Sequence, residues 1–143
     1  MAVFTWNDKF SVSVESMDKQ HKYFLDLLNN LNDQIQQKYD DETVTVAIHK
    51  LFNYAAFHFR DEENILNTTG FTGLKEQHRE HGFFMEQVKE MEESLKHGDR
   101  VQLGSVVSFL KDWFMNHIMS EDKKYAAYLK IRYASESLTL DAD

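Results

Sequence analysis

The chain has 143 residues, a formal net charge of -8 and a pI of about 5.3. This length is typical of one globular domain, and the acidic charge excludes a nucleic-acid-binding role, which requires a basic surface. The absence of cysteine excludes disulfides and thiolate metal sites and predicts a cytoplasmic protein. No stretch approaches the roughly 18 to 20 apolar residues of a membrane span, so we expect a soluble protein without a targeting segment.

Helical periodicity dominates the chain from start to finish. There is no proline and there are only five glycines, which favours long helices with short connections. Apolar residues recur at alternating steps of three and four, the spacing that lines one face of an α-helix. In chain order, the pattern predicts an N-terminal extended arm, helices over 17–38, 42–67, 73–97 and 101–120, a short helix over about 123–133, and a frayed tail over 134–143. These elements predict an all-α, up-down-up-down four-helix bundle that forms a single domain over residues 1–143.

Side chains that can bind metal interrupt each of the four predicted apolar stripes. They are His21 on the first helix, His58 and Glu62 on the second, His81 on the third and His117 on the fourth, followed by Glu121 or Asp122. A single histidine on an apolar face is more often a core side chain bonded to the backbone than a metal ligand. The same feature on four helices favours a shared site, and residues four apart, such as His58 and Glu62, can converge on one ion.

The residue types indicate which metal such a site would hold. Imidazole and carboxylate without sulfur suit iron, manganese or zinc. The set is too large for one tetrahedral zinc ion and fits two ions that share bridging carboxylates between facing helices. We therefore expect two iron ions. Spacing alone favours Glu121 as the last carboxylate, because it lies one regular helical turn beyond His117.

Separated blocks of the sequence resemble the hemerythrin family, specifically the bacterial hemerythrins. FTWNDKFSVSVESMDKQH is similar to the family's Trp-containing arm and first ligand histidine, HFRDEENIL to its His-x-x-x-Glu segment, and HREHGFF and WFMNHIMSEDKKY to its later blocks. The resemblance covers nearly the whole chain. It implies that Glu62 and Asp122 bridge the two irons, that His21 and His58 bind one of them, and that His81 and His117 bind the other. For Asp122 to face the same way as His117, the helix must be irregular or end after His117.

Gln77 departs from the family pattern, which has a histidine four residues before His81. Gln77 lies on the core stripe, so its amide oxygen can face the irons as a weaker ligand, or a water can take that place. His78 is the other candidate, but it lies about 100° around the helix from Gln77. We prefer Gln77 or water. The loss of one imidazole would add an exchangeable position and make irreversible oxidation easier.

The resemblance also implies a ligand pocket near the irons. Its expected lining is Phe59, Trp113, Phe114 and Ile118, which would form a dry apolar wall, although ordinary core packing explains each aromatic residue singly. Tyr125 could reach a ligand or close the end of the bundle. Each ligating imidazole needs a partner for its second ring nitrogen. Asp18, Gln20 and Asn116 are near ligands in sequence, whereas His49, His78 and His97 fall off the stripes and are predicted to face solvent.

These features favour an oxygen-binding protein over an enzyme. The resemblance implies that dioxygen binds as peroxide, with azide and nitric oxide as further small ligands, for oxygen storage, delivery or sensing. Sensing would require a separate signalling or redox partner protein, because the chain has no room for an output domain. A di-iron oxidase or peroxidase-like enzyme, permitted by Gln77, is the alternative, and a purely structural metal is a third hypothesis. The sequence has no phosphate loop or serine nucleophile elbow.

Overall fold

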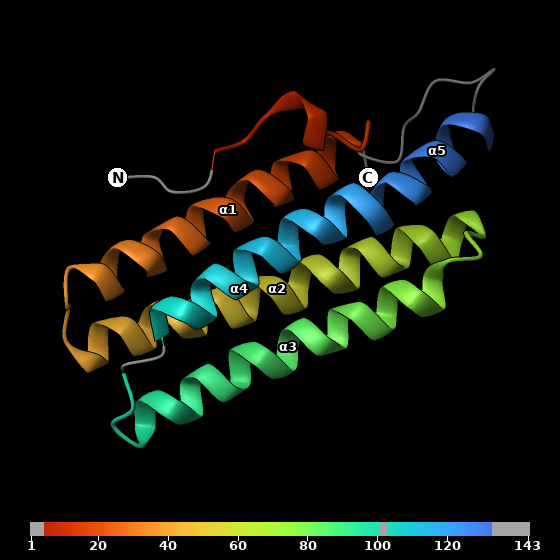
Figure 1. The fold of residues 1–143 in the computed structure, drawn as a ribbon. Coiled ribbons are helices and arrows are strands. Elements are labelled where there is room, and N and C mark those ends of the chain that lie inside the picture. The colour runs from red at the N-terminus through yellow and green to blue at the C-terminus, as the bar shows by residue number, and fades with distance from the viewer. Residues whose placement is uncertain (1–4, 101–102, 133–143) are drawn as a thin grey trace.

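A four-helix bundle, as predicted, forms the body of the computed structural model, which describes residues 5–100 and 103–132. Its helices are α1 (Glu15–Gln36), α2 (Asp41–Thr69), α3 (Leu74–Lys96) and α4 (Leu103–His117). Short connections reverse the chain between successive helices, which lie lengthwise side by side (Figure 1). A π-helical turn, η2 (Ile118–Asp122), continues α4 into α5 (Lys123–Arg132). The tail predicted over 134–143 lies outside the described residues.

Local signals set the ends of α2, the longest of these helices. At its start the Asp40 carboxylate accepts a hydrogen bond of 2.8 Å from the Thr43 amide, which satisfies an N–H group without a helical partner. At its end Gly70 adopts a φ of 74°, and the Phe71 amide donates to the Leu66 carbonyl at 3.0 Å. This glycine termination turns the chain back toward α3.

The core consists of the apolar stripes predicted from the periodicity. Its largest fully buried side chains include Phe24, Phe84, Phe114, Met17, Leu28, Leu31, Ile48, Leu51, Leu66 and Met91. Phe24 and Phe114 stack with ring centroids 4.5 Å apart and form part of an aromatic cluster inside the bundle. Burial of these side chains supplies most of the driving force for folding.

The N-terminal segment packs along the bundle with its own short 3₁₀ helix, η1 (Asp8–Phe10). Val12 and Val14 are buried, so this segment adds to the core. The Asp18 carboxylate accepts hydrogen bonds from the Ser11 hydroxyl at 2.6 Å and the Val12 amide at 2.9 Å. None of the helices in the described part of the chain is both long and apolar enough to cross a membrane.

Candidate metal centre

The side chains selected from the sequence meet inside the bundle. The set is His21 from α1, His58 and Glu62 from α2, Gln77 and His81 from α3, His117 from α4 and Asp122 from η2. Each is at most 2% exposed. Burial of this many polar groups is costly unless partners satisfy them, so their meeting point is a candidate functional site.

Glu62 occupies the middle of this cluster. Its Oε2 atom lies 3.5 Å from His21 Nε2 and 3.8 Å from His58 Nε2, while its Oε1 atom lies 3.0 Å from His81 Nε2. Two groups of ligand atoms result, one from His21, His58 and Glu62 and the other from Glu62, His81 and His117, each within 4.8 Å. Glu62 belongs to both groups, and each of its oxygens faces a different one.

Asp122 spans the same two groups. Its Oδ2 atom lies 3.4 Å from His21 Nε2, and its Oδ1 atom lies 3.1 Å from His117 Nε2. Two carboxylates therefore each present one oxygen to either side of the centre. This arrangement suits two cations that share bridging carboxylates better than one cation with a single ligand shell.

The π-helical turn explains why Asp122 rather than Glu121 reaches the centre. A π turn adds a residue to the regular α-helical turn, so the side chain facing the same way as His117 is five positions later. Glu121 is directed aside, where it forms an ion pair with Lys124 at 3.0 Å. The helix is therefore irregular after His117, and the four-residue spacing leads to Glu121, whose carboxylate lies outside the cluster.

Gln77 points into the centre and His78 does not. The Gln77 amide nitrogen donates to Asp122 Oδ1 at 2.9 Å, the oxygen that also faces His117. The His78 side chain is 76% exposed, and its Nδ1 atom contacts Glu63 at 2.7 Å. The angular argument from the sequence therefore placed both side chains correctly.

Three of the four imidazoles are oriented by hydrogen bonds from Nδ1 to an oxygen on a neighbouring helix. His58 bonds to Gln20 at 2.7 Å, His81 to Glu63 at 2.8 Å and His117 to Glu80 at 2.7 Å. Because these oxygens accept, each Nδ1 carries a proton, and Nε2, once it has lost its own proton, would offer its lone pair to a cation in the centre, as in metal sites. Among the candidates near ligands in sequence, Gln20 has this role, whereas Asp18 binds the N-terminal segment and Asn116 is exposed.

A sequence signal for these orienting residues exists in retrospect. Gln20 precedes His21, Glu63 follows Glu62, and Glu80 precedes His81, so each is adjacent to a residue of the centre. One step along a helix rotates the side chain by about 100°, which moves it from the buried stripe to the boundary with the next helix. Polar residues beside a buried ligand are therefore candidates to orient the ligands of a neighbouring helix.

Aromatic rings cover the imidazoles. The Phe59 ring stacks on His81 with centroids 4.0 Å apart and 8° between planes, and Trp113 stacks on His117 at 4.7 Å and 7°. Phe114 meets the His21 ring edge to face at 5.6 Å. Ile118 is fully buried at the start of η2. The centre is therefore enclosed by apolar side chains on several sides.

Tyr125, whose role the sequence left open, contacts the centre directly. Its hydroxyl donates to Glu62 Oε2 at 2.8 Å, and the side chain is fully buried. Burial, together with the nearby negative charges of Glu62 and Asp122, raises the pKa of Tyr125 well above its usual value. Tyr125 therefore remains a hydrogen-bond donor at neutral pH.

In the metal-free centre, buried imidazoles and carboxylates shift the pKa values of one another. Burial alone would lower the pKa of His21 and His117, but the carboxylates of Asp122 and Glu62 outweigh it and raise both values to about 9. Burial and the neighbouring His21 lower the pKa of His58 to about 3. The imidazoles hold the pKa of Glu62 and Asp122 below the usual range despite burial. Glu62 and Glu63 also raise the pKa of His81 against the effect of its burial, so the carboxylates of the metal-free centre are accompanied by imidazolium charge.

Several buried atoms of the centre have no hydrogen-bond partner within the described residues. They are His21 Nδ1 and Nε2, Glu62 Oε1, Gln77 Oε1 and Asp122 Oδ2. These atoms belong to side chains that converge on one point, where cations would satisfy the atoms that face it. Imidazole nitrogens and carboxylate oxygens, without sulfur, are ligands that suit iron.

The remaining described histidines lie outside the centre. His49 contacts Glu92 at the surface, and His97 is 80% exposed. His97 pairs with Glu93 on its own helix, so in the described part of the chain both histidines bond to surface carboxylates, which agrees with their positions off the core stripes.

Known proteins share both the sequence pattern and the fold. Residues 12–129 match the hemerythrin HHE cation binding domain. Bacteriohemerythrin of Pseudomonas aeruginosa is 26% identical over 99% of this chain and 90% of its own length. Myohemerythrin of Riftia pachyptila is 27% identical over 88% of this chain and 93% of its own. A crystal structure of wild-type hemerythrin matches with a TM-score of 0.81 and 25% identity, covering 88% of this chain and 97% of that one. The family match spans most of the bundle, so this chain belongs to the hemerythrin family of cation-binding proteins.

Proposed function

We propose that the chain binds two iron ions at this centre and uses them to bind dioxygen or another small diatomic ligand. The observation that carries the proposal is that Glu62 and Asp122 each face both imidazole groups, one oxygen to each. In this proposal His21 and His58 would hold one ion, His81 and His117 would hold the other, and Glu62 and Asp122 would contribute an oxygen to each. A ferrous pair would supply two electrons to dioxygen and recover them on release.

The protein's own side chains would make this binding reversible. The rings of Phe59, Trp113 and Phe114 against the imidazoles exclude water from the space around the ions. The Tyr125 hydroxyl and the Gln77 amide each donate a hydrogen bond to a bridging carboxylate, which fixes the carboxylate orientation. These features support ligand binding without further chemistry, so we favour an oxygen-binding protein over an enzyme.

Gln77 supports a second candidate function. Its Oε1 atom is buried and without a partner, beside the oxygen of Asp122 that faces His117. We propose that Gln77 Oε1 is a further ligand of the ion held by His81 and His117, in addition to these two imidazoles and the shared carboxylates. A neutral amide is a weaker ligand than imidazole, so this position would exchange more easily. An exchangeable position on the second ion favours the alternative, a di-iron oxidase or peroxidase-like enzyme.

Metal analysis and optical spectra test the proposal. We expect two iron ions per chain, and we expect azide and nitric oxide to change the spectrum of the iron without unfolding the protein. An oxygenated spectrum that disappears under vacuum supports the oxygen-binding function. Rapid one-way oxidation, or turnover of added hydrogen peroxide, supports the enzyme instead. A metal that binds neither azide nor nitric oxide would show a structural role and refute both functions.

Two matched pairs of variants test the ligand assignment. Asp122→Asn should lower the iron content, whereas Glu121→Gln changes the adjacent carboxylate, which pairs with Lys124, and should leave the content unchanged. His81→Ala and His78→Ala form the second pair, because one imidazole is buried in the centre and the other is exposed. Equal iron content within either pair would contradict the assigned ligands.

A further inference from the structure

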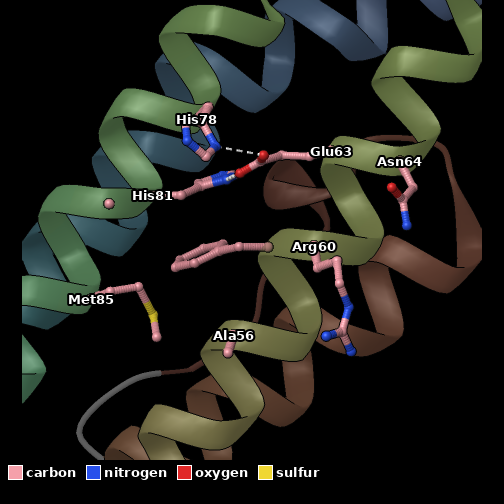
Figure 2. Close-up of a pocket in the computed structure, with 9 residues that line it drawn as sticks. Ala56, Arg60, Glu63, Asn64, His78, His81 and Met85 are labelled. Carbon is pink, nitrogen blue, oxygen red and sulfur yellow. Dashed lines mark hydrogen bonds and ion pairs between the residues drawn. The ribbon is translucent and has the colours of Figure 1, made fainter.

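A surface hollow lies between α2 and α3, next to the buried centre. Its volume is about 350 Å³, and its lining includes Ala56 and Phe59 of α2 and His81, Gly82 and Met85 of α3. Figure 2 shows the Met85 side chain reaching from α3 toward α2, where Ala56 lies, below the His81 side chain. The polar side chains of Arg60, Glu63, Asn64 and His78 complete the lining, and Glu63 bonds to the His81 imidazole at 2.8 Å. The hollow is therefore apolar on the side of Ala56, Phe59 and Met85 and polar on the other.

Two stacked rings separate the hollow from the bridging carboxylates. Phe59 and His81 both line it, and their rings lie parallel with centroids 4.0 Å apart. On its inner side His81 Nε2 lies 3.0 Å from Glu62 Oε1. A small molecule in the hollow would thus lie beside an imidazole of the centre, and motion of the Phe59 ring would let it move further inward.

Gly82 keeps the hollow open. It lies inside α3, its φ is not positive, and a Cβ atom added to it would meet nothing within 4 Å. Neither backbone conformation nor close packing therefore requires a glycine here, although glycine costs a helix interior roughly 0.5–1 kcal/mol relative to alanine. Because Gly82 lines the hollow and its Cβ position is free of contacts, a larger side chain here has room to cover part of the hollow.

We propose that this hollow is a binding site for small apolar molecules, of the size of dioxygen, on their route between solvent and the metal centre. Apolar cavities take up such molecules because they offer close contacts and little competition from water. The location beside His81 makes the hollow a route as well as a site. The route rests on the proposed function, whereas occupation of the hollow by an apolar gas does not.

The first test uses the metal-free protein and xenon, an apolar atom that binds protein cavities. Methyl NMR of the methionines should show a saturable xenon-induced shift for Met85, which lines the hollow, and none for Met91, which is 1% exposed on the same helix. Gly82→Leu should abolish the shift. Gly104→Leu is the control, because a Cβ atom at Gly104 also meets nothing within 4 Å but Gly104 lies on α4, outside the lining.

The second test measures nitric oxide binding to the iron-loaded protein by stopped flow. Gly82→Leu should slow association and dissociation about tenfold, which corresponds to about 1.4 kcal/mol added to the barrier, and leave the affinity unchanged. Ala56→Leu fills the hollow from the opposite wall and should act in the same way. Gly104→Leu should have no effect on either rate.

The outcomes separate this inference from the proposed function. No shift at Met85, a shift that Gly82→Leu leaves in place, or unchanged rates in both filled variants would each overturn the proposed route. Failure of the iron-loaded protein to bind nitric oxide would instead overturn the proposed function. The xenon result on the metal-free protein would still show whether the hollow binds apolar molecules.

Discussion

Replacement of Tyr125 by phenylalanine isolates one hydrogen bond of the centre. The Tyr125 hydroxyl donates to Glu62 Oε2 at 2.8 Å, whereas the imidazole nitrogens His21 Nε2 and His58 Nε2 lie 3.5 and 3.8 Å from the same oxygen. Tyr125→Phe keeps the ring, so it removes this bond without creating a large cavity. The variant therefore measures the contribution of a single donor to a buried carboxylate.

The expected cost follows from the charge and burial of Glu62. A hydrogen bond to a charged group contributes about 1.5–3 kcal/mol to stability. For a chain of this length each kcal/mol lowers the melting temperature by about 3–4 °C, so the metal-free variant should melt about 5–10 °C lower. With iron bound, the ions share the charge of Glu62, and the cost should fall toward the about 0.5–1.5 kcal/mol of a neutral hydrogen bond.

Urea unfolding of the metal-free and iron-loaded proteins provides the assay. Tyr128→Phe is the matched control, because the Tyr128 hydroxyl donates at 2.6 Å to the neutral Thr69 carbonyl in a partly buried site. The same hydroxyl also accepts a hydrogen bond of 3.2 Å from Arg132 at the exposed surface. Its cost should be about 0.5–1.5 kcal/mol and should not depend on iron. If Tyr125→Phe costs no more than Tyr128→Phe in the metal-free protein, the charge of Glu62 does not have the effect inferred from the structure.

Three further predictions concern pH, Gln77 and Gly82. The pKa values of His21 and His117 are raised from 6.5 to about 9 in the folded protein, so protonation of these imidazoles stabilises the metal-free fold below pH 6.5. That stabilisation is lost as pH rises toward 9. Iron affinity rises over the same range, because the ligand imidazoles must lose their protons to bind iron. Urea unfolding and iron titrations at several pH values check these two trends. Gln77→His should slow oxidation of the ferrous protein in air, and an unchanged rate would show that Gln77 does not control this reaction. Gly82→Ala should raise the free energy of unfolding by about 0.5–1 kcal/mol, as measured in urea.

The bundle was predictable because helical periodicity is a local property of the sequence. Spacings of three and four placed His21, His58, His81 and His117 on buried faces of separate helices, and the structure brings these residues together. The same spacing predicted that Gln77 faces the core and His78 faces solvent, because helix geometry fixes a rotation of about 100° per residue. Burial of these side chains was thus decided by position along each helix.

Contacts between helices were not predictable in this way. The orienting bonds from Gln20, Glu63 and Glu80 each cross to a neighbouring helix and depend on how the helices pack. The Tyr125 hydroxyl reaches Glu62 across the bundle for the same reason.

By itself the sequence determined the helices, their buried faces and the residue types available to bind metal, because these follow from short-range spacing and side-chain chemistry. Only the tertiary structure decided between Glu121 and Asp122, since the π-helical turn after His117 breaks the regular spacing on which the simple prediction relied. It also decided that both Glu62 and Asp122 face two imidazole groups, because distances between side chains on different helices depend on the packing of the whole bundle.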